Sequence, residues 1–261
     1  KSNDSIGDFS SISGGYLNTA SGSHSVVGGG RENTASRPYS TVIGGKDNVA
    51  LGWYSIVGGQ SSKAYTNGSI ALGSNAIAGV EGGDQKAVAI GYDSEATGNN
   101  SLALGFGNIV SGNNSGAIGD PNVVSGTGSY VLGNNNTVAQ DDTFVLGSNV
   151  ETTQANSVIL GNNSADKAAT SVDNATVGNL TYSGFAGVAK AENGVVSVGS
   201  EGAERQIVNV GAGEISATST DAVNGSQLFA VGSTVNNLAT SVKNNLGGNA
   251  NLNPDGTIDY T

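Results

Sequence analysis

The sequence contains no cysteine, and its 261 residues include one histidine, few charged side chains (12%) and few aromatic ones (5%). The absence of cysteine means that the fold does not rely on disulfide bonds, whatever the redox compartment of the protein. The low aromatic content argues against the core of a compact enzyme, and the low charge argues against a disordered tail. No apolar run approaches the roughly 18 residues that a membrane-spanning helix needs.

Basic residues are also scarce, with 10 Lys and Arg against 21 Asp and Glu, so the formal net charge is −11. Because a nucleic-acid partner requires a basic surface, this charge disfavours nucleic-acid binding. Glycine is abundant, at 42 residues, but it lacks the three-residue period of collagen. The composition therefore fits a repeated fold that buries small side chains in many thin layers.

A short apolar run that closes on glycine recurs along the first part of the chain. The spacing of the closing glycines is 14 or 15 residues, with one step of 18 between Gly73 and Gly91. They are Gly15, Gly29, Gly44, Gly59, Gly73, Gly91, Gly105, Gly119, Gly133, Gly147 and Gly161. A second short run follows many of them and begins at Asn18, Asn33, Asn48, Asn108, Asn122 and Asn136. A repeat this regular predicts a solenoid.

Each run is apolar on both faces of the strand that it predicts. The residue directly before the closing glycine and the residue before that are nearly all apolar or small, as are Ala89 and Ile90 before Gly91. Adjacent side chains of a strand point to opposite faces, but a solenoid coil has only one interior. The second apolar face needs another cover, and an identical chain is the simplest one. The sequence therefore predicts an oligomer.

Each coil of about 14 residues is expected to hold two short strands and two turns, stacked at roughly 4.8 Å on the next coil. Glycine permits a positive φ at a tight turn, and a following Asn or Ser can bond its own backbone there. The single long step, over residues 79–84, predicts a loop that protrudes from one coil. This loop is either a binding loop or a tolerated surface insertion, and its candidate residues are Val80, Glu81, Gly82, Gly83 and Asp84.

The pattern changes after residue 165. Short strands are expected over residues 177–182 and 194–199, and Ser219-Thr220-Asp221 predicts a helix start with a hydroxyl cap and an acid in the first turn. A seam of a and d positions then runs through Leu228, Val231, Val235, Leu238 and Val242 and continues to Asn245. The helix should end at Gly247-Gly248, and a turn over residues 253–256 should start a hairpin.

Together these segments resemble the trimeric autotransporter adhesins of Gram-negative bacteria. Residues 86–94 differ only at their first two positions from the YadA-like head repeat Asn-Ser-Val-Ala-Ile-Gly-x-x-Ser, and residues 156–164 keep its opening and its close. Residues 209–213 followed by 219–228 resemble the neck of the family, which usually has Ala where Gly211 stands. Residues 181–187 are similar to a connector common in these proteins.

The resemblance implies a mainly β fold: a left-handed parallel β-roll, or solenoid, of about eleven repeats in an obligate homotrimer. It places the head at residues 1–165, a connector at 166–203, the neck at 204–227, a coiled-coil stalk segment at 228–246 and the start of a further stalk domain at 247–261. It also implies surface display through a C-terminal outer-membrane anchor, the only expected contact with a membrane. The sequence is thus expected to be a piece of a longer protein.

No catalytic constellation is apparent in the sequence. His24 stands alone without any cysteine, so acyl-transfer triads and zinc sites lack their parts, and His24 is interpreted as a turn or surface residue. Asp141-Asp142 lacks the spacing of a calcium loop and is interpreted as a solvated turn. We therefore expect no enzymatic activity and no cofactor. The one possible bound group is an anion such as chloride, which the resemblance implies that Asn245 holds on the trimer axis. The alternative is that Asn245 only sets the register of the helices.

The resemblance implies binding to a host matrix protein such as collagen, fibronectin or laminin, or to a host cell-surface receptor. In collagen-binding heads the repeats are implicated, which marks Val88, Ala89, Ile90 and Gly91, and Asn156, Ser157, Val158, Gly161 and Ser164; the simpler interpretation is that these residues build the roll. A rival site is an aromatic set at turns or their edges, comprising Tyr39, Trp53, Tyr54, Tyr65 and Tyr92.

Two other classes of function stay open. The first is that the head acts as a structural spacer or an autoagglutination module, with the adhesive site elsewhere in the full-length protein. A repeat-built carbohydrate or ice binder is the other class, although Thr does not recur at a fixed repeat position, as ice binding would require.

Overall fold

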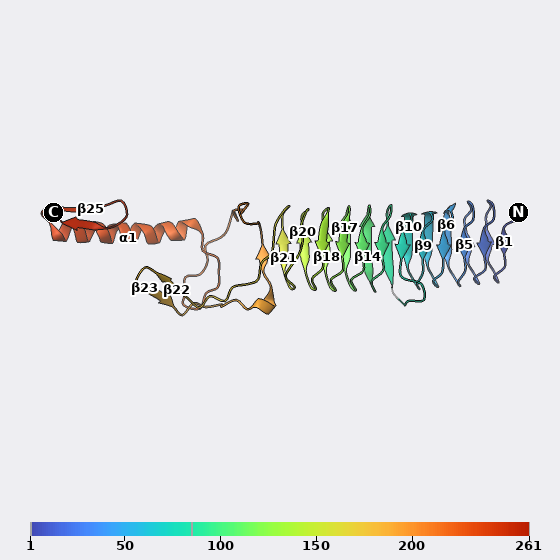
Figure 1. Ribbon diagram of the computed structural model, residues 1–261, viewed down its shortest axis with the longest axis horizontal. Coiled ribbons are helices and arrows are strands. Elements are labelled where there is room, and N and C mark those ends of the chain that lie inside the picture. Colours follow the sequence, from blue (N-terminus) through green and yellow to red (C-terminus); the bar gives the residue numbers. More distant parts are fainter. Residues whose placement is uncertain (1, 85, 261) are drawn as a thin grey trace. The chain divides into compact units, whose positions relative to one another are not determined.

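The computed structural model describes residues 2–84 and 86–260. The chain divides into two compact units, one formed by Lys1–Thr170 with Lys190–Arg205 and the other by Ser171–Ala189 with Gln206–Thr261. The first unit is a parallel β-solenoid, in which strands of two sheets alternate along the chain (Figure 1). This confirms the predicted coil of two short strands and two turns.

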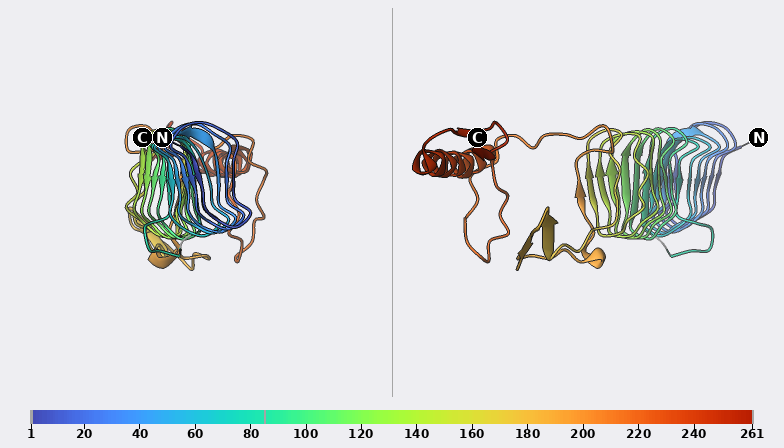
Figure 2. Two further views of the ribbon diagram at one scale, coloured as in Figure 1. Left: turned by 90° about the vertical axis from the view of Figure 1, so that its right-hand side faces the viewer. Right: turned by 60° about the vertical axis from the view of Figure 1, so that its left-hand side comes forward.

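Ten strands form the first sheet: β1 (Asp4–Ser5), β3 (Thr19–Ala20), β5 (Thr34–Ala35), β7 (Val49–Ala50), β9 (Lys63–Ala64), β11 (Ile77–Ala78), β13 (Glu95–Ala96), β15 (Ile109–Val110), β17 (Asn122–Val124) and β19 (Asn136–Val138). Twelve form the second: β2 (Ser11–Ile12), β4 (Val26–Val27), β6 (Thr41–Lys46), β8 (Ile56–Gln60), β10 (Ile70–Ser74), β12 (Ala87–Ile90), β14 (Ser101–Gly105), β16 (Gly116–Gly119), β18 (Tyr130–Leu132), β20 (Phe144–Leu146), β21 (Val158–Leu160) and β24 (Val196–Ser197). Viewed from one end, the successive coils lie nearly behind one another (Figure 2).

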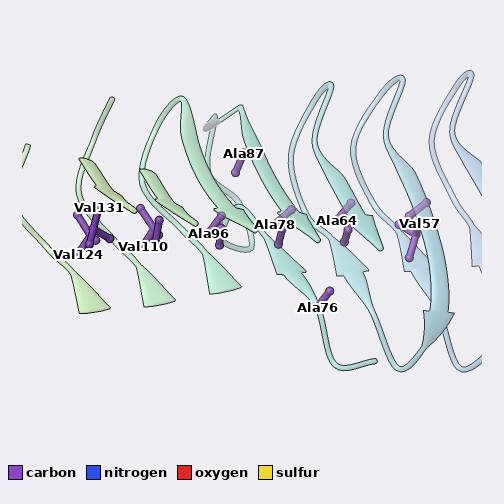
Figure 3. Packing of buried hydrophobic residues seen from close by; sticks show 14 of the residues in the cluster. Val57, Ala64, Ala76, Ala78, Ala87, Ala96, Val110, Val124 and Val131 are labelled. Carbon is purple, nitrogen blue, oxygen red and sulfur yellow. The ribbon is translucent and has the colours of Figure 1, made fainter. Parts of the chain in front are cut away.

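The interior of the solenoid is a narrow column of alanine and valine side chains. Val57 of β8 and Ala64 of β9 are fully buried within one coil, and Val110 and Val124 occupy the same column further along (Figure 3). Because the two sheets lie close together, only small side chains fit between them. The low aromatic content of the sequence follows from this narrow interior.

A ladder of buried asparagines joins the coils at the corner before the first sheet. The Asn33 N–H donates to Oδ1 of Asn18 (3.0 Å), and Nδ2 of Asn33 donates to the carbonyls of Gly29 and Gly45 (both 2.9 Å). In one later coil Ser62 stands at the equivalent position, and its hydroxyl donates to the Gly73 carbonyl (3.1 Å). The ladder satisfies backbone groups that a buried corner would otherwise leave unpaired.

Several closing glycines are required by the close approach of one coil to the next. At Gly91, φ is +135°, and a Cβ there would overlap the carbonyl of Gly105 in the following coil. Because glycine has no Cβ, it adopts this backbone conformation without strain and avoids the overlap.

The second sheet extends beyond residue 165, where the sequence places the end of the head. After β21, a segment over residues 166–189 leaves the solenoid, and the chain returns through a short 3₁₀ helix, η1 (Ala191–Asn193), to add β24 in parallel to β21. The strand expected over residues 194–199 is therefore part of the solenoid sheet. The strand expected over residues 177–182 is wrong, because the chain turns at Gly178 between β22 (Asn174–Val177) and β23 (Leu180–Ser183), which pair in an antiparallel hairpin.

The helix α1 (Gly225–Leu246) begins later than the expected start at Ser219. Asn224 caps it: the Asn224 side chain accepts from the Gln227 N–H (3.3 Å), and Oε1 of Gln227 accepts from the Asn224 N–H (3.2 Å). This is a capping box, whereas the Ser219 hydroxyl accepts only from the Asp221 N–H (3.2 Å) in an irregular segment. The predicted helix end is confirmed at Gly247, and β25 (Ala250–Leu252) and β26 (Ile258–Tyr260) form the predicted hairpin.

The seam of α1 is exposed along its whole length in the single chain. Its residues are Leu228, Val231, Val235, Leu238 and Val242, whose exposed fractions range from 42% to 68%. A seam of large apolar side chains that faces water needs a partner helix. Among the described residues, no helix is both long and apolar enough to cross a membrane.

Candidate functional site

The outward side of the second sheet carries an exposed apolar surface. Its residues, called the apolar face below, are Leu102, Leu104, Ile118, Tyr130, Leu132, Phe144, Leu146, Val158 and Leu160. Leu132 and Leu146 are each about half exposed, whereas Val131 and Val145 beside them point inward and are buried. This alternation confirms the predicted second apolar face, and no part of the described chain is seen to cover these side chains fully.

The apolar face is best developed in the later coils. Outward positions of the first coils alternate between small residues such as Ser11 and larger ones such as Val26, whereas most later coils place a large residue in the same rows. At Gly116 the row is filled from the next coil, because a Cβ there would meet the Tyr130 ring at 2.9 Å. Tyr130 in turn stacks on Phe144, with ring centroids 5.4 Å apart.

A second surface lies at the corner that leads into the second sheet. Four rings from successive coils stack there: Phe9 on His24 (centroids 5.0 Å apart), His24 on Tyr39 (4.9 Å) and Tyr39 on Tyr54 (5.1 Å). These four residues are called the aromatic corner stack below. The exposed fractions are 84% for Phe9, 47% for Tyr39 and 59% for Tyr54, so the stack is a surface feature.

All four residues of the stack have a left-handed backbone, with φ between 57° and 59°. The corner is held by backbone hydrogen bonds between coils, such as His24 N–H to the Asp8 carbonyl (2.8 Å) and Tyr39 N–H to the Ser23 carbonyl (2.9 Å). Nδ1 of His24 also lies 2.8 Å from the Ser23 hydroxyl. Bulky residues rarely adopt this backbone conformation, so the stack holds four unfavourable corners in a row.

The aromatic residues that were predicted to form one binding site lie in different places in the structure. Tyr39 and Tyr54 lie in the stack, and Trp53, which is 47% exposed, precedes Tyr54 in the same turn. Tyr65 is half-buried, and Tyr92 lies at the other corner of its coil, stacked on Phe106 at 5.4 Å. Sequence reasoning missed Phe9 and His24, although the 15-residue spacing of positions 9, 24, 39 and 54 is visible in the sequence.

The repeat residues that the resemblance marks lie partly inside the coil. The side chains of Ala89 and Ser157 are fully buried and that of Ser164 nearly so, whereas Val88, Ile90 and Gly91 are half-buried on the outward side. Asn156 is exposed at a left-handed corner, and Val158 belongs to the apolar face. The Ser164 hydroxyl donates to the Leu160 carbonyl (2.7 Å), and Gly161 lies against the Arg205 side chain.

The long step in the repeat forms a loop between β11 and β12, as predicted, and Figure 1 shows it protruding from the solenoid. Val80, Glu81, Gly82 and Asp84 are exposed and Gly83 is half-buried, and the Gly83 N–H donates to the Val80 carbonyl (3.0 Å) in a turn. Position 85 lies outside the described residues. The loop presents no cluster of ligand-binding side chains within its described part.

Charged side chains gather at the corner opposite the stack. Nη2 of Arg31 lies 2.9 Å from Oε1 of Glu32, and Nζ of Lys46 lies 3.3 Å from Oδ2 of Asp47. Hydrogen bonding to Glu32 raises the pKa of Arg31, and hydrogen bonds with Glu32 and then Lys46 lower the pKa of Asp47. Because water screens these surface pairs, they form a solvated polar edge.

The predicted turn at Asp141-Asp142 is present. The Asp141 side chain accepts from the Thr127 N–H (2.7 Å), and Asp142 has φ of 51° at the corner. Among residues 2–84 and 86–260, no group of three or more His, Cys, Asp or Glu side chains is placed to hold a metal ion.

Comparison with protein families matches both units. The model of the coiled stalk of trimeric autotransporter adhesins matches residues 206–251. The model of the YadA head domain repeat matches residues 54–76, 85–108, 96–120 and 125–149, which lie in the solenoid.

Two curated relatives are adhesins. The chain is 58% identical over 67 residues to the autotransporter adhesin BtaE of Brucella suis biovar 1, covering 26% of this chain and 9% of BtaE. It is 44% identical over 92 residues to the trimeric autotransporter adhesin AtaA of an Acinetobacter species, covering 34% of this chain and 2% of AtaA. The chain thus spans only a small part of the length of these relatives.

One solved structure that resembles the chain is the C-terminal YadA-like domain of a Burkholderia pseudomallei protein, which is 33% identical in sequence. The aligned region covers 53% of this chain and 63% of the solved structure. Its TM-score of 0.39 is too low to add to the description of the fold. The matches to head repeats and stalk follow the order solenoid, then helix, that the structure describes. The chain therefore carries YadA-type head repeats followed by a segment of the coiled stalk of trimeric autotransporter adhesins.

Proposed function

We propose that the chain forms the homotrimeric head of a bacterial surface adhesin that binds a host matrix protein or a host cell-surface receptor. The observation that carries this proposal is the apolar face of the second sheet in a chain of the adhesin family. A soluble chain that exposes Leu132, Leu146 and their neighbours gains by covering them with copies of itself. Because these side chains are already about half covered in the single chain, full burial of each Leu contributes about half of the roughly 1.5–3 kcal/mol expected for a fully exposed one.

The seam of α1 supports the same stoichiometry. Like the apolar face, it consists of large side chains that a single chain leaves in water. A three-fold assembly covers both surfaces with the same set of copies, which fits the trimeric autotransporter adhesins whose stalk and head repeats match this chain.

Host binding is proposed for the surfaces that the other copies do not cover. The aromatic corner stack and Trp53 lie at a corner of the first coils, away from the apolar face of the later coils, and exposed Tyr and Trp side chains are favoured binding residues. Collagen, fibronectin, laminin and cell-surface receptors are the ligands to test first. Display at the bacterial outer membrane belongs to the same proposal, as does a role in adhesion rather than in enzymatic conversion.

The oligomeric state is tested by light scattering on the purified chain. We expect a mass three times that of the 25.7 kDa chain. A stable monomer at micromolar concentration would rule out the homotrimer.

Adhesion is tested by displaying the head on a non-adherent bacterium and measuring attachment to immobilised collagen, fibronectin, laminin and cultured epithelial cells. Attachment to at least one surface is expected. Attachment to none of them, with cell-to-cell clumping retained, would favour the spacer or autoagglutination module over a host-binding head.

A further inference from the structure

The aromatic corner stack has a cost that the solenoid itself does not explain. The same corner position in other coils has the same left-handed backbone but holds Gly68, Asn100, Asn114, Gly128, Asp142 and Asn156. Glycine, asparagine and aspartate are the residues that tolerate this conformation. The first coils instead place Phe9, His24, Tyr39 and Tyr54 there. The fold can therefore make this corner without aromatic residues, and with less backbone strain.

The stack also exposes aromatic rings at positions where other coils hold polar residues or glycine. Its members are among the few aromatic residues of the sequence, and three of them are about half exposed or more. Stacking between the rings recovers part of the cost, because each inner ring is covered on both faces. Strain held at a surface position where the fold does not need it points to a role in binding.

We infer that the aromatic corner stack, together with Trp53, binds a neutral oligosaccharide. This inference rests on the proposed function as an adhesin and names the chemical class of one ligand. A pyranose ring has apolar C–H faces and a rim of hydroxyl groups. The stack offers matching chemistry, since its ring edges are apolar and its tyrosine hydroxyls and imidazole can exchange hydrogen bonds.

The spacing of the stack favours a chain of sugar rings. Its rings repeat at 4.9–5.1 Å, which follows from the stacking of one coil on the next. Sugar rings in an extended oligosaccharide follow one another at a similar spacing. Successive sugar units can therefore lie along successive coils, each against the aromatic ring of one coil.

The end of the stack offers a different contact. The ring after Tyr54 is missing, because the next corner residue is Gly68, and a methyl group at Gly68 would meet no atom within 4 Å. The outer face of the Tyr54 ring is thus left without a stacked ring, and Trp53 stands next to it in the chain. An open aromatic face suits a terminal sugar ring packed through its C–H groups.

The charge of the protein favours a neutral saccharide over an anionic one. The stack contains no carboxylate and no ammonium group, and the net charge of −11 repels polyanions at long range. Arg37 and Asp8, of opposite sign, lie in the turns that carry Tyr39 and Phe9. Binding is therefore expected to come from ring packing and hydrogen bonds, with little dependence on salt.

The test uses substitutions that the chain itself supplies. Tyr39→Asn and Tyr54→Asn place at the stack the residue found at the corners of Asn100 and Asn114, so the solenoid should be kept. Tyr92→Asn makes the same change at an exposed tyrosine outside the stack and serves as the control. Circular dichroism and light scattering check that each variant retains its fold and its mass, and the melting temperature should not fall, because Asn relieves the strained corner.

Binding is measured by calorimetry with neutral tetrasaccharides built from glucose, galactose or N-acetylglucosamine, and with heparin as the anionic comparison. At least one neutral tetrasaccharide should bind, with affinity reduced about tenfold or more in Tyr39→Asn and Tyr54→Asn and unchanged in Tyr92→Asn. Because Trp53 is the single tryptophan, its fluorescence should change at the same saccharide concentrations. This readout does not depend on the stability of any variant.

Each other outcome is decisive. The inference is overturned if no neutral saccharide binds, if only heparin binds, or if binding survives both tyrosine changes without an effect on Trp53. When the same preparation still attaches to matrix proteins or cells, the oligosaccharide inference fails and the proposed adhesin function stands. If it attaches to neither, the proposed function fails as well.

Discussion

At the scale of single residues, the solenoid depends on side chains that satisfy buried backbone groups between coils. Asn33 is the clearest case, since its amide bonds the Gly29 and Gly45 carbonyls while its Oδ1 accepts from the Asn48 N–H (3.1 Å). The side chain is fully buried, so water cannot replace these hydrogen bonds. One residue thus links the coils on either side of it.

Replacing Asn33 by Ala should lower the free energy of unfolding by about 2–3 kcal/mol, because buried donors and acceptors lose their partners. Asn33→Ser is the matched control, since Ser62 fills the equivalent position and still donates to a carbonyl of the next coil. We expect the serine variant to lose less stability in a denaturant titration. Equal losses for Ala and Ser would show that the ladder contributes only by filling space.

The sequence predicts much at this scale, and its failures have a physical cause. Repetition of Val or Ala two residues before most closing glycines suffices to predict the inward column, as Val57 and Ala89 illustrate. Phe9 and His24 are missed because a lone histidine and an N-terminal phenylalanine show no binding signature by themselves. Their meaning comes from contact with Tyr39 across coils.

At the scale of elements, the last coil is closed by an arginine that arrives from distant sequence. Nη1 of Arg205 donates to the Ser164 hydroxyl (2.8 Å) and to the Val198 carbonyl (2.8 Å), and Nη2 donates to the Asn162 carbonyl (2.6 Å). These bonds fasten the segment that carries β24 to the end of the solenoid. The planar guanidinium can reach all three acceptors at once.

Arg205→Ala should release β24, with a loss of about 1–2 kcal/mol after allowance for solvent exposure. Hydrogen exchange at Val196 and Ser197 should accelerate, while exchange in β4 and β6 stays unchanged. Arg205→Lys should recover only part of the protection, because an ammonium lacks the forked geometry. Full recovery by lysine would mean that charge alone fastens the strand, and Arg37→Ala controls for removal of an exposed arginine.

The start of α1 shows why element boundaries are hard to predict. Ser219-Thr220-Asp221 has the composition of a helix cap, but Gln227 also binds the backbone of Gly213, donating to its carbonyl (2.7 Å) and accepting from its N–H (3.0 Å). This contact favours the capping box at Asn224 over the earlier candidate. The helix end was predictable, because Gly247 is a local signal that needs no tertiary partner.

Asn245 stays a prediction at this scale. It is exposed in the last turn of α1, at a d-type position of the seam. In the trimer we expect its three side chains to surround an anion on the axis, so crystals grown in bromide should show an anomalous peak at that layer. The peak should vanish in Asn245→Val. Asn245 side chains that turn away from the axis would leave only the role in setting the register.

At the scale of the whole molecule, the repeat and the need for identical partners were predictable from the sequence. Both follow from apolar residues in adjacent strand positions, which no single coil can bury. The addition of β24 to the solenoid was not predictable, because Val196 pairs with Val158 across a long intervening segment. Local pattern carries no information about such a return.

Leu132→Asp should prevent assembly, because a carboxylate on the apolar face would be buried without a partner in the trimer. Val123→Asp is the control, since Val123 is exposed to a similar degree but lies on the outward side of the first sheet, in β17. Light scattering should give a smaller mass for Leu132→Asp and an unchanged one for Val123→Asp. A trimeric Leu132→Asp variant would place the contact between copies elsewhere.

The parallel stacking of coils has a mechanical consequence. Hydrogen bonds between neighbouring strands run along the direction in which the coils stack, so tension along that direction loads them in series. A single solenoid pulled from its ends would open one coil at a time, starting with the weakest interface. Copies joined along the apolar face would share the load at every coil, so that several rows of bonds must break together before the rod lengthens.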